Sequence, residues 1–300
     1  MNYVLGFDGG GTKTECVLMD PMGKILARSI AGPSNPSRVG VESAAREIEK
    51  AADLCLQEVR ATRAAVAALG AGLAGTTDPD RKERMRAALA GAFPGAAVNI
   101  FTDLEMALAA AGEGPVIVLV AGTGSAAIGR DAQGQIWRTG GYGPLLSDDG
   151  SAYDIGSRAV ARAMKEREER GSDSSLGKAI LEKLGYESWP DLQQRAKQQA
   201  DSVFPLVFPV VAAQADEGDV AAREILVQAA RELASLVQVV ADHGAYGREE
   251  MLIAKTGGTV GRSAFFDAQV DAALKQVLPQ ARTGSLRMPP AEAAARAARY

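Results

Sequence analysis

Short apolar runs near the start of the chain predict a meander of three β-strands. Residues 3–7 form an apolar run, residues 14–19 alternate between polar and apolar side chains, and residues 24–30 follow a turn at Pro21-Met22-Gly23. Alternation with period two is the pattern of a half-buried strand. The first two strands are joined by a turn with three successive glycines, Gly9 to Gly11.

A helical period follows the meander and then alternates with further strands. Residues 39–61 predict one long helix, 64–69 a buried strand, 78–92 a second helix and 98–101 another strand. Asp78 is a plausible N-cap of the second helix, with Pro79 at the first helical position. Asp103 then opens a short alanine-rich helix.

The pattern restarts after the Gly112-Glu113-Gly114-Pro115 turn. Buried strands are predicted in the second half at 116–120 and 126–129, with a mostly helical stretch over 150–245; a further strand at 251–254 and helices over 263–277 and 290–299 complete it. Both halves therefore open with a β-hairpin that has a glycine-rich tip. This weak repeat predicts an α/β protein of two domains with mixed sheets, and a ligand cleft between them.

Composition excludes several classes of protein. The 300 residues carry 33 Lys plus Arg against 37 Asp plus Glu, a net charge of −4 and a pI near 5.3. Such a chain has no long-range attraction for nucleic acid or an anionic membrane. The longest apolar stretch, 202–215, is interrupted by Pro205 and Pro209, and the N-terminus has no basic leader. We therefore expect a cytoplasmic protein.

Cysteine and histidine are too scarce for several kinds of chemistry. Cys16 and Cys55 lack metal-ligand spacing and are interpreted as buried free thiols in a reducing compartment. The single histidine, His243, rules out a His-cluster metal site and argues against a Ser-His-Asp triad. Carboxylates, backbone amides and a bound ligand must therefore do the chemistry.

The first glycine turn is not a P-loop. The pattern G-x-x-x-x-G-K-[ST] fails because Thr12 stands where Lys is required, and the turn leads into a strand, whereas a P-loop opens a helix. The turn is instead a glycine hairpin whose backbone amides can cradle phosphate. Asp8, at the end of the strand, is placed to hold a hydrated Mg²⁺ beside that phosphate. The alternative is a tight hairpin with Asp8 as a turn residue.

Two other glycine runs imitate a dinucleotide-binding fingerprint. Residues 70–75 match G-x-G-x-x-G, and residues 122–127 match its G-x-G-x-x-A variant. A Rossmann unit needs a helix to begin within the motif. After the first run the helix begins too late, at Asp78, and the second run continues into a strand and a turn. Both matches therefore fail in context.

Taken together, the motifs resemble those of the N-acetylglucosamine kinase and BadF/BadG/BcrA/BcrD-type ATPase family, in the actin, sugar kinase and heat-shock ATPase superfamily. They occur in family order over nearly the whole chain. The matching segments are 8–14, 72–75, Thr102-Asp103, 122–125, 140–143, 148–151 and Gly257-Gly258. The resemblance implies two ribonuclease-H-like (actin-like ATPase) domains with a central ligand cleft. They would cover 1–112, with the C-terminal helix 288–300 packed back on it, and 113–287, with a helical insertion.

The resemblance also implies how ATP and Mg²⁺ bind. Two glycine hairpins would hold the phosphates, two further glycines would pass beneath the adenosine, and Asp8 would organise Mg²⁺ through water. The nucleotide-binding residues it implies are Gly10, Gly11, Thr12, Lys13, Gly122, Thr123, Gly124, Gly257 and Gly258.

Asp103 matches the family's catalytic aspartate. In that role it accepts the proton of a sugar hydroxyl while the oxygen attacks the γ-phosphate. The alternative is a plain helix N-cap, for which Asp is a favoured residue. From the residues alone the two interpretations are evenly balanced, and the resemblance favours catalysis.

The resemblance assigns a sugar site to Asn35, Asp103, Thr123, Gly141, Tyr142, Gly143 and Asp148. Asn35 is otherwise a turn residue between two prolines, and Asp148, Asp149 and Ser151 are otherwise caps of the helix that begins near Gly150. Tyr142 stands where Trp is usual and Ser147 where Gly is usual, which leaves the identity of the sugar open.

The function implied is an ATP-dependent kinase acting on a hydroxyl of an amino sugar, N-acetylglucosamine or glucosamine, in a homodimer. One alternative is an ATPase that drives electron transfer to an acyl-CoA reductase or dehydratase, but its bridging iron–sulfur cluster needs cysteines that the chain does not offer in a suitable place. A non-catalytic sugar or nucleotide sensor is another alternative. A DNA-binding repressor is not expected, because only seven residues precede Asp8.

Overall fold

The computed structural model describes residues 2–246 and 251–299, which fold as two compact units. Unit 1 contains Met1–Glu113 together with Leu286–Tyr300, and unit 2 contains Gly114–Ser285. Each unit has a hydrophobic core of its own. The domain limits expected from the sequence, 112/113 and 287/288, remain a prediction about independently folding domains.

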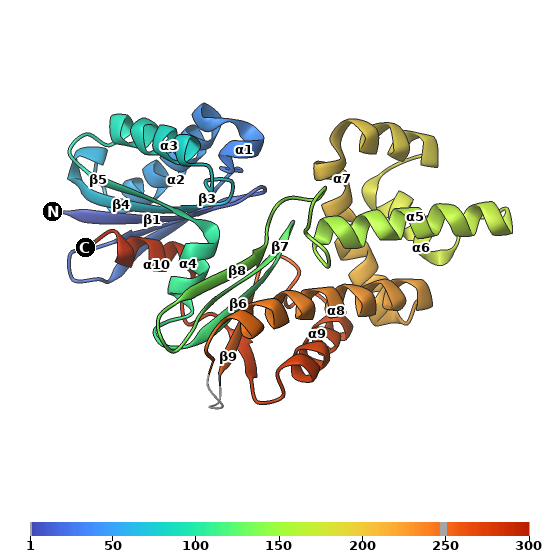
Figure 1. Ribbon diagram of the computed structural model, residues 1–300. Helices are drawn as coiled ribbons and strands as arrows, with labels where there is room; N and C mark the ends of the chain where they lie inside the picture. Colours follow the sequence, from blue (N-terminus) through green and yellow to red (C-terminus); the bar gives the residue numbers. More distant parts are fainter. Residues whose placement is uncertain (1, 247–250, 300) are drawn as a thin grey trace. The chain divides into compact units, whose positions relative to one another are not determined.

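Unit 1 is built on a mixed five-stranded sheet with the order β3-β2-β1-β4-β5 (Figure 1). Strand β2 runs antiparallel to β1 and to β3, whereas β4 and β5 run parallel to β1. The strands are β1 (Tyr3–Gly9), β2 (Thr14–Met19), β3 (Ile25–Ala31), β4 (Val66–Leu73) and β5 (Ala97–Thr102). The predicted meander is confirmed, and the glycine run at 70–73 is the end of a strand.

Helices cover both faces of this sheet, and successive side chains of β1 pack against helices on opposite faces. Leu5 and Phe7 of β1 belong to the core that includes α2 (Val41–Glu58) and α3 (Pro79–Ala92). Val4 lies on the opposite face, in a cluster with α10 (Pro290–Ala297). Asp8 shares the parity of Val4 and therefore lies on the α10 face. The short helix α4 (Asp103–Ala110) packs beside α10 on this face.

Two glycines allow α10 to approach the sheet closely. A Cβ atom on Gly6 would stand 2.1 Å from the carbonyl oxygen of Ala291, and one on Gly70 would stand 2.2 Å from that of Ala294. A side chain cannot be accommodated at either position unless the helix moves. Gly70, the first glycine of the dinucleotide-like run, is therefore explained by helix packing.

Unit 2 repeats the topology of unit 1. Its sheet has the order β10-β9-β6-β7-β8, with β7 antiparallel to both neighbours and β9 parallel to β6 and β10. The strands are β6 (Val116–Ala121), β7 (Ser125–Arg130), β8 (Ile136–Gly140), β9 (Leu252–Thr256) and β10 (Arg282–Ser285). Read from β8, this is the same 3-2-1-4-5 order as in unit 1, the order of a ribonuclease-H-like domain. The predicted α/β fold of two such domains is confirmed.

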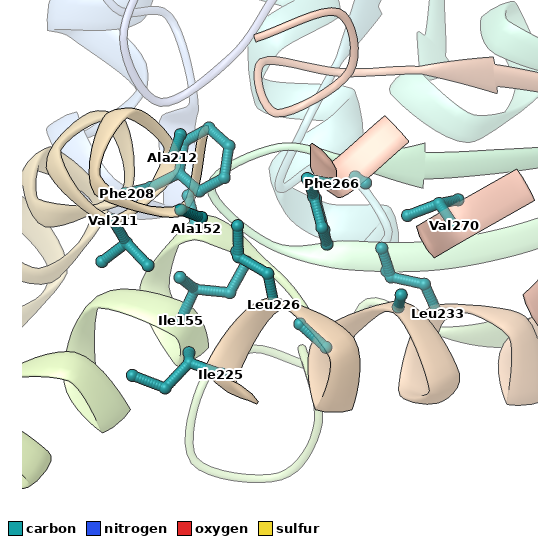
Figure 2. Close-up of a cluster of buried hydrophobic side chains, with 14 of the residues drawn as sticks. Ala152, Ile155, Phe208, Val211, Ala212, Ile225, Leu226, Leu233, Phe266 and Val270 are labelled. Atoms are coloured by element: carbon teal, nitrogen blue, oxygen red, sulfur yellow. The ribbon is translucent and has the colours of Figure 1, made fainter. Parts of the chain in front are cut away.

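A group of helices joins β8 to β9 in unit 2. These helices are α5 (Ala152–Arg170), α6 (Ser175–Leu184), α7 (Trp189–Glu217) and α8 (Val220–His243). Together with α9 (Ala264–Val277) they form a continuous apolar core. Figure 2 shows part of that cluster, with Ile155 of α5, Phe208 of α7, Leu226 of α8 and Phe266 of α9 among the labelled side chains.

Three local features differ from the sequence prediction. The helix expected over 39–61 is divided into α1 (Pro36–Val39) and α2 at Gly40, whose φ of 80° is unfavourable for other residues. Strands β8 and β10 were not predicted. Most residues of β8 are exposed, and β10 has the sequence Arg-Thr-Gly-Ser, so neither carries a buried apolar period. Among the described residues, no helix is long and apolar enough to span a membrane.

Candidate functional site

The β1–β2 hairpin is held in place by backbone hydrogen bonds. The amide of Gly10 donates to the carbonyl oxygen of Lys13 at 3.0 Å and closes the turn. The carbonyl oxygen of Gly10 accepts from the amides of both Ser34 and Asn35, each at 3.1 Å. The hairpin is therefore fixed to the segment that begins α1.

The three glycines of this hairpin are required for different reasons. A Cβ on Gly9 would stand 2.1 Å from Oγ of Ser34, so the fold itself needs glycine there. A Cβ on Gly11 would stand 3.2 Å from the guanidinium of Arg38. Gly10 has an ordinary φ, and its nearest neighbour, the oxygen of Lys13, would be 3.9 Å away. The fold does not need a glycine at position 10, which fits a position that a ligand approaches closely.

Asp8 is a half-buried carboxylate near the end of β1. Its register partners are Glu15 on β2 and Gly72 on β4. The pKa of Asp8 is raised to about 7, first by burial and then by the negative charges of Glu15 and Asp103, with the positive charge of Lys13 opposing them. Lys13 forms an ion pair with Glu15. Asp8 therefore sits in a locally acidic environment that a cation would relieve.

Asp103 is the first residue of α4, and it does not cap that helix. Thr102 is the N-cap: its hydroxyl accepts from the amide of Glu105 at 3.2 Å, and the Glu105 carboxylate accepts from the amide of Thr102 at 2.7 Å. The N-cap interpretation of Asp103 is therefore wrong, because this capping box already satisfies the helix start.

The carboxylate of Asp103 lies in an environment that favours its protonated form. Oδ1 accepts from the amide of Leu104 at 3.0 Å. Burial nevertheless raises the pKa of Asp103 above its ordinary value, against the lowering effect of the Leu104 amide. Asp103 also contributes to the raised pKa of Asp8. Unit 1 therefore brings together two carboxylates that both hold protons more strongly than usual.

Asn35 is the N-cap of α1. Its Oδ1 accepts from the amide of Ser37 at 2.9 Å and from the Ser37 hydroxyl at 2.7 Å. The side chain is buried, and a Cβ on Gly75 would stand 2.2 Å from Oδ1. The cap thus engages the oxygen, and the amide nitrogen is the part with which Asn35 would contact a sugar. Its role in sugar binding stays a prediction.

The β6–β7 hairpin of unit 2 is also fixed by its backbone. The amide of Gly122 donates to the carbonyl oxygen of Gly124 at 2.9 Å. The carbonyl oxygens of Gly122 and Thr123 accept from the amides of Ala152 and Tyr153, at 2.9 Å and 3.4 Å. The hairpin is therefore fixed against the beginning of α5.

Gly257 and Gly258 lie beside this hairpin. Gly257 has a φ of 115°, and a Cβ on it would stand 2.2 Å from the oxygen of Ala121, so the backbone requires glycine. Nothing lies within 4 Å of a Cβ built on Gly258. The amide of Gly258 is 3.5 Å from a Cβ built on Gly122, so the two glycine segments are adjacent. Gly258 and Gly10 thus share an open setting that the fold alone does not demand.

Asp148 faces the β6–β7 hairpin of its own unit. Its carboxylate is buried, Oδ1 accepts from the amide of Ser125 at 3.2 Å, and its backbone φ is 70°. A Cβ on Gly124 would be 2.8 Å from the carboxylate. Helix α5 is capped by Ser151, whose hydroxyl accepts from the amide of Asp154. The capping alternative therefore holds for Ser151, whereas Asp148 supports the hairpin.

The segment before Asp148 contains the predicted sugar wall. Gly141 and Gly143 have positive φ values of 73° and 90°, and the amide of Tyr142 donates to the hydroxyl of Ser147 at 2.9 Å. The Tyr142 side chain is 58% exposed. Such a ring is accessible to a ligand or to another protein surface.

The predicted site residues thus form two groups. Unit 1 holds Asp8, Gly10, Gly11, Thr12, Lys13, Asn35 and Asp103. Unit 2 holds Gly122, Thr123, Gly124, Gly141, Tyr142, Gly143, Asp148, Gly257 and Gly258. The sequence interpretation missed Thr102 as the cap, although Thr-x-x-Glu is a capping-box pattern. It assigned no role to Arg38, whose guanidinium lies 3.2 Å from a Cβ built on Gly11.

Comparison with known proteins finds relatives that match most of the chain. An N-acetyl-D-glucosamine kinase of Dictyostelium discoideum is 30% identical over 92% of this chain and 91% of its own. An N-acetylmuramic acid/N-acetylglucosamine kinase of Clostridium acetobutylicum is 30% identical over 87% of this chain and 86% of its own.

Solved structures with lower identity share the fold. A Chromobacterium violaceum protein proposed to be an N-acetylglucosamine kinase superposes with a TM-score of 0.83, at 23% identity over 98% of both chains. A ROK family glucokinase of Streptomyces griseus, solved with glucose and AMPPNP, has a TM-score of 0.65 at 17% identity over 99% of both chains. The model of the BadF/BadG/BcrA/BcrD ATPase family matches residues 5–298, and the chain belongs to that family.

Proposed function

We propose that this protein is an ATP-dependent kinase that phosphorylates a hydroxyl group of an amino sugar, with N-acetylglucosamine as the first candidate. The observation that carries the proposal is the setting of Asp103, a half-buried carboxylate whose pKa is raised and which is not needed as the helix cap, because Thr102 caps α4. The two relatives that are 30% identical over most of the chain are named as kinases of N-acetylglucosamine.

Asp103 would act as the general base. Its carboxylate would accept the proton of the sugar hydroxyl as that oxygen attacks the γ-phosphate of ATP, and the raised pKa makes the carboxylate a better proton acceptor. The bond between the γ-phosphorus and the β,γ-bridging oxygen breaks, and ADP is the leaving group. The proton remains on Asp103 until the sugar phosphate leaves. The single histidine of the chain, His243, is the last residue of α8 in unit 2.

The glycine hairpins would bind the nucleotide. The open settings of Gly10 and Gly258 fit the close approach of a phosphate and of the adenosine. Gly11, Thr12, Lys13, Gly122, Thr123, Gly124 and Gly257 complete the proposed set. Carboxylate oxygens are the ligands that Mg²⁺ prefers, and Asp8, in its acidic environment, would hold the ion through water. When bound, Mg²⁺ would neutralise charge on the phosphates.

The sugar would be recognised by Asn35, Thr123, Gly141, Tyr142, Gly143 and Asp148, in addition to Asp103. Tyr142 offers an exposed aromatic ring, which can cover the apolar face of a sugar. A glucosamine kinase of Vibrio cholerae is 25% identical over 78% of this chain, and the Clostridium acetobutylicum relative also carries N-acetylmuramic acid in its name. The choice among these amino sugars, a homodimeric state and a cytoplasmic location are part of this proposal.

An ATPase that couples to an acyl-CoA reductase or dehydratase is the alternative within the same family. Its iron–sulfur cluster would need cysteines at a surface. Cys16 and Cys55 are both buried in the core of unit 1, where Cys55 Sγ lies 3.8 Å from the carbonyl oxygen of Cys16. Their setting is that of structural thiols and does not support a bridging cluster.

The proposal is tested by ADP release with ATP, Mg²⁺ and a panel of N-acetylglucosamine, glucosamine, N-acetylmannosamine, N-acetylmuramic acid and glucose. We expect one amino sugar to stimulate ADP release well above the rate without sugar. If ATP binds and no sugar stimulates ADP release, the kinase proposal fails and the energy-coupling or sensor alternative replaces it.

A further inference from the structure

The side chain of Arg38 lies against the tip of the β1–β2 hairpin. A Cβ built on Gly11 would stand 3.2 Å from Nη1 of Arg38, 3.7 Å from Cδ and 3.8 Å from Cζ. The arginine is in the last turn of α1 and is exposed. Its guanidinium is therefore placed beside the glycine amides to which a phosphate would bind.

Backbone hydrogen bonds fix the position of Arg38 relative to the hairpin. The amide of Arg38 donates to the carbonyl oxygen of Asn35 at 3.0 Å, and the amide of Asn35 donates to the carbonyl oxygen of Gly10 at 3.1 Å. Two hydrogen bonds thus connect the backbone of Arg38, through Asn35, to the hairpin. These bonds hold the backbone of Arg38 close to Gly10.

The charge balance of this region favours a cation at that position. Asp8 is surrounded by the negative charges of Glu15 and Asp103, and the Lys13 ammonium is paired with Glu15. A phosphate chain would bring further negative charge to the same hairpin. A guanidinium is always charged, and its planar fork of donors matches the oxygens of a phosphate.

We propose that Arg38 binds the phosphate chain of the nucleotide at the Gly10–Gly11 hairpin. This inference rests on the proposed nucleotide site. The shared chemistry is an oxyanion, which could also come from the carboxylate of a sugar acid such as N-acetylmuramic acid. The position of the guanidinium, 3.2 Å from a Cβ built on Gly11, favours phosphate, because Gly11 belongs to the hairpin and not to the segment that would bind the sugar.

The test is equilibrium binding of ATP, inorganic tripolyphosphate and adenosine, without sugar, to wild type, Arg38→Ala, Arg38→Lys and Arg46→Ala. Arg46 is the matched control, an exposed arginine on α2 that bonds the Ser43 hydroxyl. We expect Arg38→Ala to weaken ATP and tripolyphosphate about tenfold or more, the loss of one charged hydrogen bond, and to leave adenosine within about twofold. Arg38→Lys should recover part of the loss, and Arg46→Ala should bind like wild type.

The result that overturns the proposal is unchanged ATP and tripolyphosphate binding in Arg38→Ala. If Arg38→Ala binds ATP like wild type and a separate kinase assay shows a raised KM for N-acetylmuramic acid alone, the proposal is overturned in favour of a sugar carboxylate. Equal loss of adenosine binding would also overturn it, because it would indicate a structural role. Nucleotide binding is measured without sugar, so an Arg38-dependent affinity in a protein that phosphorylates no sugar would sustain this proposal and refute the kinase function.

Discussion

The two units have the same strand order and carry different chemistry at corresponding places. In unit 1 the first strand ends in Asp8-Gly9 before its glycine turn, and the acid is half-buried with a pKa of about 7. In unit 2 the first strand ends in Val120-Ala121 before its own glycine turn. The nearby acid, Asp148, accepts from the amide of Ser125 and braces the hairpin. The proposed general base and the proposed Mg²⁺ ligand therefore both belong to unit 1.

The units also differ in the connection between their third and fourth strands. In unit 1 this crossover contains α1 and α2, whereas in unit 2 it contains the four helices α5 to α8. The second crossover contributes many side chains to an apolar core that also includes residues of β6 and α9, and Figure 2 shows part of this core. The two units therefore share one sheet topology and differ in the residues at their strand ends and in the length of one crossover. Such differences allow two copies of one fold to have different functions.

The largest expected effect comes from removing the base in unit 1. Asp103→Asn should lower kcat for sugar phosphorylation about 10²- to 10⁴-fold, because the amide cannot accept the hydroxyl proton. Thermal unfolding should show no loss of stability, since Thr102 retains the helix cap. The control is Asp80→Asn, which changes an exposed acid in the first turn of α3. An Asn variant with near-normal kcat would remove Asp103 from the chemistry.

The raised pKa of Asp8 predicts an unusual dependence of stability on pH. The unfolded chain ionises this acid near its ordinary pKa of 3.8, whereas the folded chain holds the proton to about 7. The folded state therefore binds more protons between these values, and stability falls as pH rises through that window. The full loss amounts to at most about 4 kcal/mol.

Urea unfolding of wild type and Asp8→Asn with a metal chelator, at pH 5 and pH 8, measures this effect. Wild type should lose more stability than the variant between the two values. Asp8→Asn should also raise the Mg²⁺ concentration at which the kinase reaction reaches half of its maximal rate. Parallel pH profiles for the two proteins would contradict the raised pKa.

Glycine-to-alanine pairs separate fold from ligand binding in each unit. Gly9→Ala and Gly257→Ala should destabilise the protein by about 1–3 kcal/mol, because the new Cβ would meet Ser34 and Ala121 at little more than 2 Å. Gly10→Ala and Gly258→Ala should leave stability within about 0.5 kcal/mol and weaken ATP binding by about tenfold.

Chemical denaturation and ATP titration on the four variants provide the readouts. Gly9→Ala is the control for Gly10→Ala, and Gly257→Ala is the control for Gly258→Ala, since the two glycines of each pair are adjacent in sequence. A normal ATP affinity in both Gly10→Ala and Gly258→Ala would place the nucleotide elsewhere.

Two substitutions of Asp148 in unit 2 should differ in their effect on stability. Asp148→Asn keeps an oxygen that can accept from Ser125 and a residue type that tolerates the positive φ, so stability should change by less than about 1 kcal/mol. Asp148→Ala should cost about 1–3 kcal/mol, because the buried amide of Ser125 loses its acceptor. Thermal unfolding distinguishes the two, and a higher KM for sugar in Asp148→Asn alone would support a direct sugar contact.

Much of the fold could be predicted because its strands carry clear buried patterns. The strands around Leu5, Val17 and Val118, and the helix that begins at Asp78-Pro79, were read from local periodicity and capping. Strands β8 and β10 could not be, since their pairing depends on β7 and β9 and not on their own residues. The close packing of α10 on Gly6 and Gly70 is likewise a long-range effect.

The candidate site divides in the same way. Asp103 was found from its motif, but its release from capping depends on the paired contacts of Thr102 and Glu105, which a single position does not reveal. Arg38 could be identified as a candidate only from the structure, in which it lies beside Gly11. Sequence motifs thus predicted the candidate site residues, and tertiary contacts showed which side chains also have a structural role.

The measurement that tests the central claim most directly is detection of the sugar product by mass spectrometry. Wild type and Asp103→Asn would each be incubated with ATP, Mg²⁺ and N-acetylglucosamine. The account predicts one phosphate added to the sugar for each ADP formed by wild type, and product reduced at least about 10²-fold in the variant. ADP formed by wild type without any sugar phosphate, or equal product from both proteins, would contradict it.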